Sequence, residues 1–64
     1  MITAVKMIDG QWISTKETIA GKVIDSMSFY QDDNETIIIL WGTEGTKIGE
    51  LNYRNVLVVL MDQE

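Results

Sequence analysis

The sequence predicts an all-β protein, a five- to six-stranded antiparallel meander that closes toward a small barrel, with at most one short helical turn. Isoleucine, valine, threonine and aromatic residues recur along the 64 residues, and these residue types favour strands. Short segments rich in glycine, asparagine and aspartate separate the apolar runs, as turns do, and the chain contains no proline. Because the connections are short, each segment is expected to pair with its neighbour in sequence.

The first expected element is a hairpin in residues 3–15, TAVKMIDGQWIST. Asp9-Gly10 is typical of a two-residue type I′ turn, in which both central residues have positive φ. Such a loop pairs Met7 with Trp12 and places both side chains on the same face as Val5. Residues 14–21 combine the spacing of a capping box with a terminal glycine, and they predict a single helical turn or an irregular loop.

The remaining segments alternate between strands and turns. Residues 22–31, KVIDSMSFYQ, have the pattern of a strand with Val23, Met27 and Phe29 on one side. After it we expect, in order, a polar turn at 31–35, an apolar strand at 35–42, a tight turn at 42–45, a short strand at 46–52, a turn at 52–55 and a last strand at 56–61.

From Gly21 onward, the order of these segments (GKVIDSMSFY, QDDNE, TIIILWG, TEG, TKIGEL, NYRN, VLVV) resembles that of the small SH3-like barrels of the Tudor and KOW kind. Those barrels consist of strand, loop, strand, tight turn, short strand, a single 3₁₀ turn and a last strand. The resemblance implies a barrel-like meander over residues 21–64. Residues 1–20 then add an N-terminal hairpin and turn, and residues 1–64 make up one domain. No function follows from the resemblance, because neither an aromatic cage nor a basic stripe can be recognised in the sequence.

Two of the expected strands are apolar on both faces, since Ile37–Trp41 and Val56–Met61 are continuous apolar runs. A chain of this size has little surface of its own to cover them, and it has neither cysteine nor histidine for a disulfide or a typical zinc site. We therefore expect a homodimer or permanent docking on a larger protein. In the last strand, either Val56, Val58 and Leu60 or Leu57, Val59 and Met61 form the interface set, and the pattern leaves that choice open. The candidate interface residues are Trp12, Ile37, Ile39, Trp41, Tyr53, Leu57, Val59 and Met61.

The charge of the chain bears on its partners. Ten acidic and five basic residues give a formal net charge of −5, which disfavours binding to a phosphate backbone or to an anionic membrane. Imitation of DNA by acidic side chains is a further alternative, but the acids are too sparse to match the charge density of a duplex. We expect a protein partner, and neither direct nucleic-acid binding nor membrane binding.

No residue is predicted to serve catalysis, metal binding or cofactor binding. Asp32, Asp33 and Glu35 lie where a turn is needed, and they lack the spacing of a calcium loop. Ser14 and Lys16 have no recognisable pocket around them, and without histidine or cysteine the chain lacks the usual groups of acid–base and nucleophilic catalysis.

The sequence thus predicts a small acidic, non-enzymatic protein-binding module. In type it is similar to small bacteriophage or prophage proteins that occlude a host enzyme or anti-phage defence complex, which would make it an anti-defence inhibitor working as a homodimer. The N-terminus has no long apolar segment of a signal peptide, so a cytoplasmic location is expected, in the host cell if a phage encodes the chain. The alternative is an SH3-like accessory module in a nucleic-acid-associated transcription or repair complex.

Overall fold

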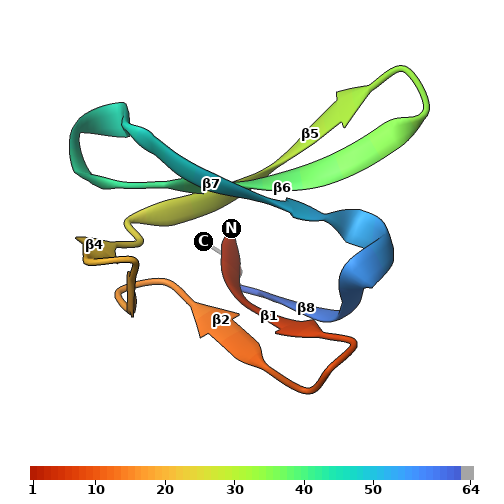
Figure 1. Cartoon of the computed structure of the whole chain (residues 1–64), viewed down its shortest axis with the longest axis horizontal. Helices are drawn as coiled ribbons and strands as arrows, with labels where there is room; N and C mark the ends of the chain where they lie inside the picture. The colour runs from red at the N-terminus through yellow and green to blue at the C-terminus, as the bar shows by residue number, and fades with distance from the viewer. Residues whose placement is uncertain (63–64) are drawn as a thin grey trace.

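A computed structural model describes residues 1–62 (Figure 1). In chain order the elements are β1 (Ile2–Met7), β2 (Trp12–Ser14), β3 (Thr18–Ile19), β4 (Lys22–Val23), β5 (Ser26–Asp32), β6 (Glu35–Trp41), the 3₁₀ helix η1 (Thr43–Gly45), β7 (Lys47–Asn52), the 3₁₀ helix η2 (Tyr53–Asn55) and β8 (Val56–Met61). They form three antiparallel sheets, with strand orders β2-β1-β8, β3-β4 and β5-β6-β7.

The β1–β2 hairpin forms where the sequence predicts it, but its loop is one residue longer. Residues 8–10 connect the strands, and the Met7 amide donates to the Gln11 carbonyl across the loop at 2.8 Å. Only Gly10 has positive φ, at 94°, whereas a type I′ turn requires positive φ at Asp9 as well. The prediction of a two-residue turn is therefore wrong.

The longer loop shifts the register of the hairpin by one residue. Lys6 pairs with Trp12, and Val5 pairs with Ile13. Because side chains alternate between the faces of a strand, the shift moves Trp12 to the face opposite Val5. The expectation that Val5, Met7 and Trp12 share a face is wrong for Trp12, which lies on the outer face of the sheet.

Residues 14–23 contain a miniature hairpin and no helical turn. Its two-residue loop is Ala20-Gly21, where both residues have positive φ, 51° and 79°, as a type I′ turn requires. The Ser14 amide donates to Glu17 Oε1 at 3.0 Å, so the capping-box spacing stabilises a loop here. Ile24 and Asp25 then separate β4 from β5, which divides the predicted strand at 22–31 into two.

The β5-β6-β7 sheet follows the sequence prediction closely. β5 and β6 pair without interruption from Ser26↔Trp41 to Asp32↔Glu35 around the expected polar turn. β6 lies in the centre of the sheet, and β7 pairs with its other edge. The 3₁₀ helix η2 occupies the position of the predicted turn at 52–55.

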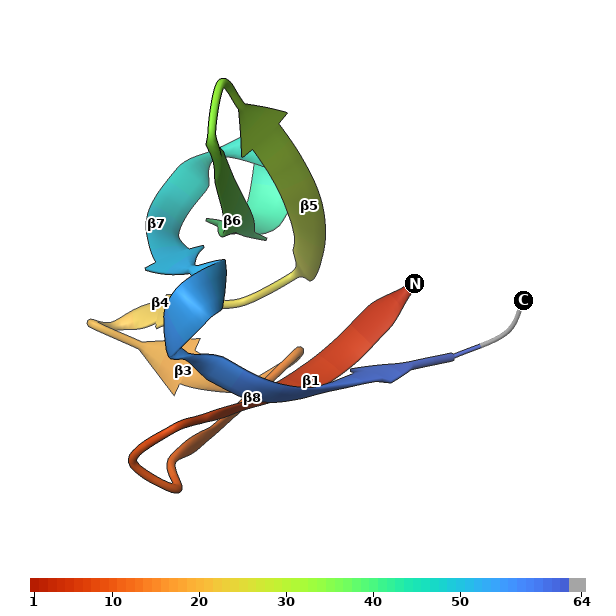
Figure 2. The same ribbon diagram turned by 90° about the vertical axis from the view of Figure 1, so that its right-hand side faces the viewer.

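The core lies between the two larger sheets, which face one another in Figure 2. Its buried side chains are Ile2, Val5, Ile13, Ile24, Met27, Ile38 and Leu40. Ile38 and Leu40 come from the inner face of β6, and Val5 and Ile13 come from the opposing sheet. The core is therefore built from both halves of the chain.

The all-β prediction is confirmed over residues 1–62, and four details of it are wrong. There are eight strands instead of five or six, and two 3₁₀ turns instead of one. The sheets do not close into a barrel, and β8 pairs with β1, so the chain is not a pure meander. No helix within this part of the chain is long and apolar enough to cross a bilayer.

Candidate interaction site

Strand β8 presents most of its apolar side chains to solvent. It pairs with β1 along one edge and has no strand on its other edge within residues 1–62. Leu57, Val58, Leu60 and Met61 are exposed, while only Val56 and Val59 are partly buried against the core. The strand carries no charged residue.

A β-bulge interrupts the alternation near the start of β8. Lys6 pairs with Val58 and the next residue, Met7, pairs with Val56, so Leu57 has no partner on β1. The expectation that one alternating set is buried and the other exposed is wrong. Of the candidate interface set, Leu57 and Met61 are exposed and Val59 contacts the core.

The outer face of β6 carries Ile37, Ile39 and Trp41, opposite the core residues Ile38 and Leu40. Ile39 is buried, and Ile37 and Trp41 are half-buried. In register, Ile39 lies between Ser28 on β5 and Glu50 on β7.

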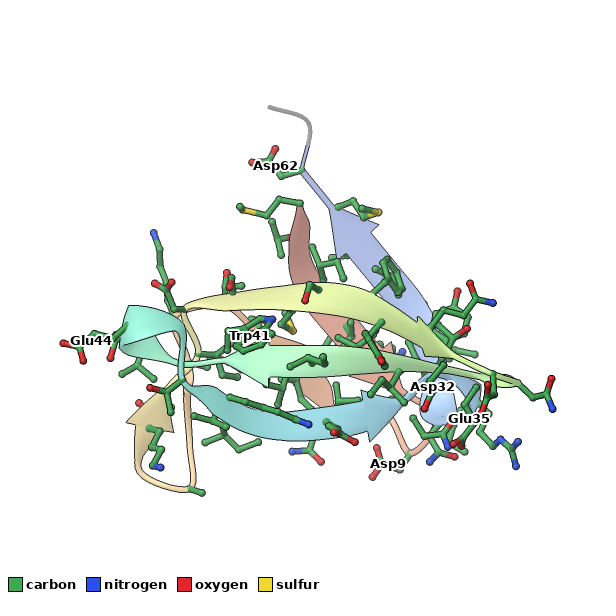
Figure 3. All side chains as sticks on the ribbon, turned by 90° about the horizontal axis from the view of Figure 1, so that it is seen from above. Asp9, Asp32, Glu35, Trp41, Glu44 and Asp62 are labelled. Atoms are coloured by element: carbon green, nitrogen blue, oxygen red, sulfur yellow. The ribbon has the colours of Figure 1, made fainter. Side chains whose placement is uncertain are left out.

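The Trp41 side chain, labelled in Figure 3, is tied to its own sheet, because its Nε1 donates to Ser28 Oγ at 2.8 Å. Much of the second face of β6 is thus shielded from solvent without a second chain.

Trp12 lies on the outer face of the β2-β1-β8 sheet, away from the outer face of β6. Its register partner Lys6 places Nζ 5.8 Å from the centre of the indole ring, a cation–π arrangement. The structure therefore distributes the candidate interface residues over different surfaces.

Phe29 and Tyr53 form an exposed aromatic pair at the end of the β5–β6 hairpin. Their ring centroids are 5.8 Å apart with an interplanar angle of 72°, the edge-to-face geometry that aromatic pairs favour. Tyr53 is one of the candidate interface residues. Phe29 is not one of them, and the sequence pattern places it on the same side of its strand as Met27. Phe29 does share the face of Met27, but it lies nearer the hairpin tip, on an edge strand of its sheet, and is 46% exposed.

A hydrogen-bonded asparagine holds the surroundings of Tyr53 in place. Asn52 Nδ2 donates to Glu35 Oε1 at 3.3 Å, and Asn52 Oδ1 accepts from the Arg54 amide at 3.0 Å. These bonds link the hairpin tip to η2. Beside Tyr53 is a hollow of about 190 Å³, which Glu35, Thr36 and Asn52 also line.

Carboxylates gather at the β5–β6 turn, where Asp32 and Glu35 lie on the opposite face of the hairpin from Phe29. Asp32 and Glu35 pair across β5 and β6, and Figure 3 shows them together at one end of the molecule. Asp33 is one of the two turn residues between them. In residues 1–62 no group of three or more acidic side chains is arranged to hold a metal ion.

A larger hollow of about 390 Å³ lies between the β3–β4 hairpin and η1, with Lys22, Thr43 and Glu44 among its lining residues. These side chains form no hydrogen bond or ion pair with one another. The geometry there indicates no particular chemistry.

Comparison with known proteins gives no match: no family model, no curated protein and no solved structure is similar to this chain.

Proposed function

We propose that this chain is a non-enzymatic protein-binding module whose recognition surface consists of Phe29 and Tyr53, together with the carboxylates Asp32, Asp33 and Glu35 at the neighbouring β5–β6 turn. The observation that carries the proposal is the aromatic pair itself. Its two rings come from different elements, β5 and η2, and each remains nearly half exposed, at 46% and 45%.

Large, rigid aromatic side chains of this kind dominate binding energies at protein interfaces. Tyrosine is among the residues enriched at hot spots, where truncation to alanine costs about 2 kcal/mol or more. The pair is also preorganised, because Asn52 bonds to both the hairpin tip and the backbone of η2. Binding then orders few additional side chains, which lowers its entropic cost.

The charges at the β5–β6 turn favour a basic partner. Within residues 1–62, Asp32, Asp33 and Glu35 form no ion pair. The ion pair found in this part of the chain joins Lys47 and Glu50 on β7. Opposite charges at the rim of an interface steer association and fix its orientation. We infer that the partner offers an apolar side chain flanked by lysine or arginine.

The test is capture of a partner by the immobilised chain, followed by reconstitution with the purified partner. We expect Tyr53→Ala and Phe29→Ala to weaken binding about thirtyfold or more, which corresponds to about 2 kcal/mol. Tyr30→Ala is the matched control for the aromatic pair, because Tyr30 is 50% exposed and points away from Phe29, to the face of β5 that also carries Asp32. Equal binding by all three variants, or a captured partner that is nucleic acid, would contradict the proposal.

Inhibition of a bacterial host protein in the manner of small phage proteins stays a prediction that rests on the type of chain. The same experiment addresses it, because an inhibitor would lower the activity of the captured partner at equimolar concentration. The SH3-like accessory role in a nucleic-acid-associated complex also stays a prediction, and recovery of nucleic acid would favour it.

A further inference from the structure

We propose that the free edge of β8 is covered by β8 of a second copy of this chain, in antiparallel orientation, so that one sheet runs through both chains in the order β2-β1-β8-β8-β1-β2. The proposal goes beyond the recognition surface and uses none of its residues.

The first argument is that this edge is unguarded. Proteins usually protect an exposed edge strand with charged side chains, proline, or a covering segment. β8 has no charged residue and no proline, and no described element pairs with its outer edge. Its bulge at Leu57 lies near the start of the strand, while Val58, Val59 and Leu60 pair with β1 in unbroken register.

The second argument comes from the direction of the main-chain groups. Asp62 bonds to Met1 through both its amide and its carbonyl, at 2.8 and 2.9 Å, so both groups of Asp62 face β1. Main-chain groups alternate in direction along a strand, and those of Met61 and Val59 therefore point away from β1, toward the free edge. These donors and acceptors are the ones available to another strand.

The same alternation restricts the register, and within that restriction we place the two-fold axis at Val59. Residues that exchange hydrogen bonds across an antiparallel pair must both point their main-chain groups at the partner strand. A two-fold axis at Val59 satisfies this condition, with Val59 opposite Val59 of the second copy. Val58 then lies opposite Leu60 of the second copy, and two exposed apolar side chains cover each other at each end of the contact.

The third argument is charge, which favours a second copy in antiparallel orientation. The chain carries a net charge of −5, yet residues 56–61 are neutral, so two copies can meet here without opposing their acids. Asp62 follows the strand and Arg54 precedes it by two residues. In the antiparallel arrangement each Asp62 lies near Arg54 of the other copy, whereas a parallel arrangement would place the two Asp62 carboxylates together.

The first test is sedimentation equilibrium over a range of protein concentrations. We expect a monomer–dimer equilibrium in the wild type. Leu60→Lys should raise the dissociation constant about a hundredfold or more, since the lysine is introduced twice in a two-fold dimer. Val23→Lys is the matched control, with the same charge change at a valine of β4 that is 46% exposed, against 47% for Leu60. It should dimerise like the wild type.

The second test separates pairing of main chains from contact of side chains. Met61→Ala and Met61→Pro both remove the exposed side chain, but only proline removes the outward-pointing amide. We expect Met61→Pro to weaken the dimer clearly more than Met61→Ala, while both monomers keep the wild-type circular dichroism spectrum. Equal dissociation constants for the two variants would overturn edge pairing.

The third test reports the register, and the absence of native cysteine makes it direct. Directly opposed residues that do not exchange hydrogen bonds have Cα atoms about 4.5 Å apart, within disulfide range, whereas diagonal neighbours are about 7–8 Å apart. A mixture of Val58→Cys and Leu60→Cys chains should therefore form the mixed disulfide faster than either variant forms its own.

A monomer at every concentration would overturn the proposal. It would leave the recognition surface intact, since that surface is tested by Phe29→Ala and Tyr53→Ala on a partner protein. Dimers that persist in Leu60→Lys, or that form the Val58 homodisulfide as fast as the mixed one, would also overturn it.

Discussion

Replacing Ile38 and Ile39 one at a time tests which face of β6 supports the fold. The two isoleucines are neighbours in the central strand of the β5-β6-β7 sheet, and their side chains point to opposite faces. Ile38 is fully buried in the core, with 0% exposure, whereas Ile39 is 9% exposed on the outer face.

Truncation of a buried isoleucine to alanine costs about 2–5 kcal/mol, and the cost rises with the volume of the cavity that is left. For Ile38, which is enclosed by both sheets, we expect a loss of about 4 kcal/mol. For Ile39, whose neighbours Ser28 and Glu50 can relax toward the gap, we expect about 2 kcal/mol. The total stability of a small domain is about 5–15 kcal/mol, so Ile38→Ala should be close to unfolding at room temperature.

Urea denaturation followed by circular dichroism, at one low protein concentration, measures both variants. We expect the midpoint of Ile38→Ala to fall well below that of Ile39→Ala, with similar dependence of free energy on urea. Equal midpoints, or a lower midpoint for Ile39→Ala, would refute the assignment of the inner face of β6 to the core.

Two further substitutions test local features. Gly10→Val should destabilise the fold by about 1–2 kcal/mol, because Gly10 has a φ of 94° while a Cβ there meets no atom within 4 Å, so the cost is one of backbone conformation. An unchanged thermal midpoint would show that the loop adopts another conformation. Ser28→Ala should cost about 1 kcal/mol by leaving the half-buried Trp41 Nε1 without its acceptor, and a shift in the tryptophan fluorescence maximum should accompany it. A Ser28→Thr variant, which restores a hydroxyl, is the control.

The sequence patterns located most strands and turns because those features are local. The strand at 35–41 and the 3₁₀ turn at 53–55 follow from an apolar run and a polar break, and both lie where they are expected. The Asp9-Gly10 signal was ambiguous in a way that the sequence cannot resolve. A left-handed glycine ends a three-residue hairpin loop as readily as it fits a two-residue one. That single residue decided which face Trp12 occupies.

The features that matter for interaction depend on contacts between distant parts of the chain. The bulge at Leu57 arises in the pairing of β8 with β1, so no pattern within residues 56–61 reveals it. Phe29 is 46% exposed although its register partner Ile38 is fully buried, since Phe29 lies on an edge strand of the sheet and Ile38 on the central one. The sequence pattern places Val58 and Leu60 in one of two alternating sets, and their exposure depends on how β8 pairs in the folded chain.

The pairing of β8 with β1 also has a consequence for the order of folding. The bond between Met1 and Asp62 spans 61 positions of the chain, whereas the β5–β6 turn closes within a few residues. Loop-closure entropy makes the long connection about 2–3 kcal/mol more costly to form than the short one. We therefore expect the β5-β6-β7 sheet to assemble early and β8 to join β1 late. Until β8 joins, β1 is paired only with β2 and its other edge is open, and the chain is most prone to pair with the wrong strand during this interval.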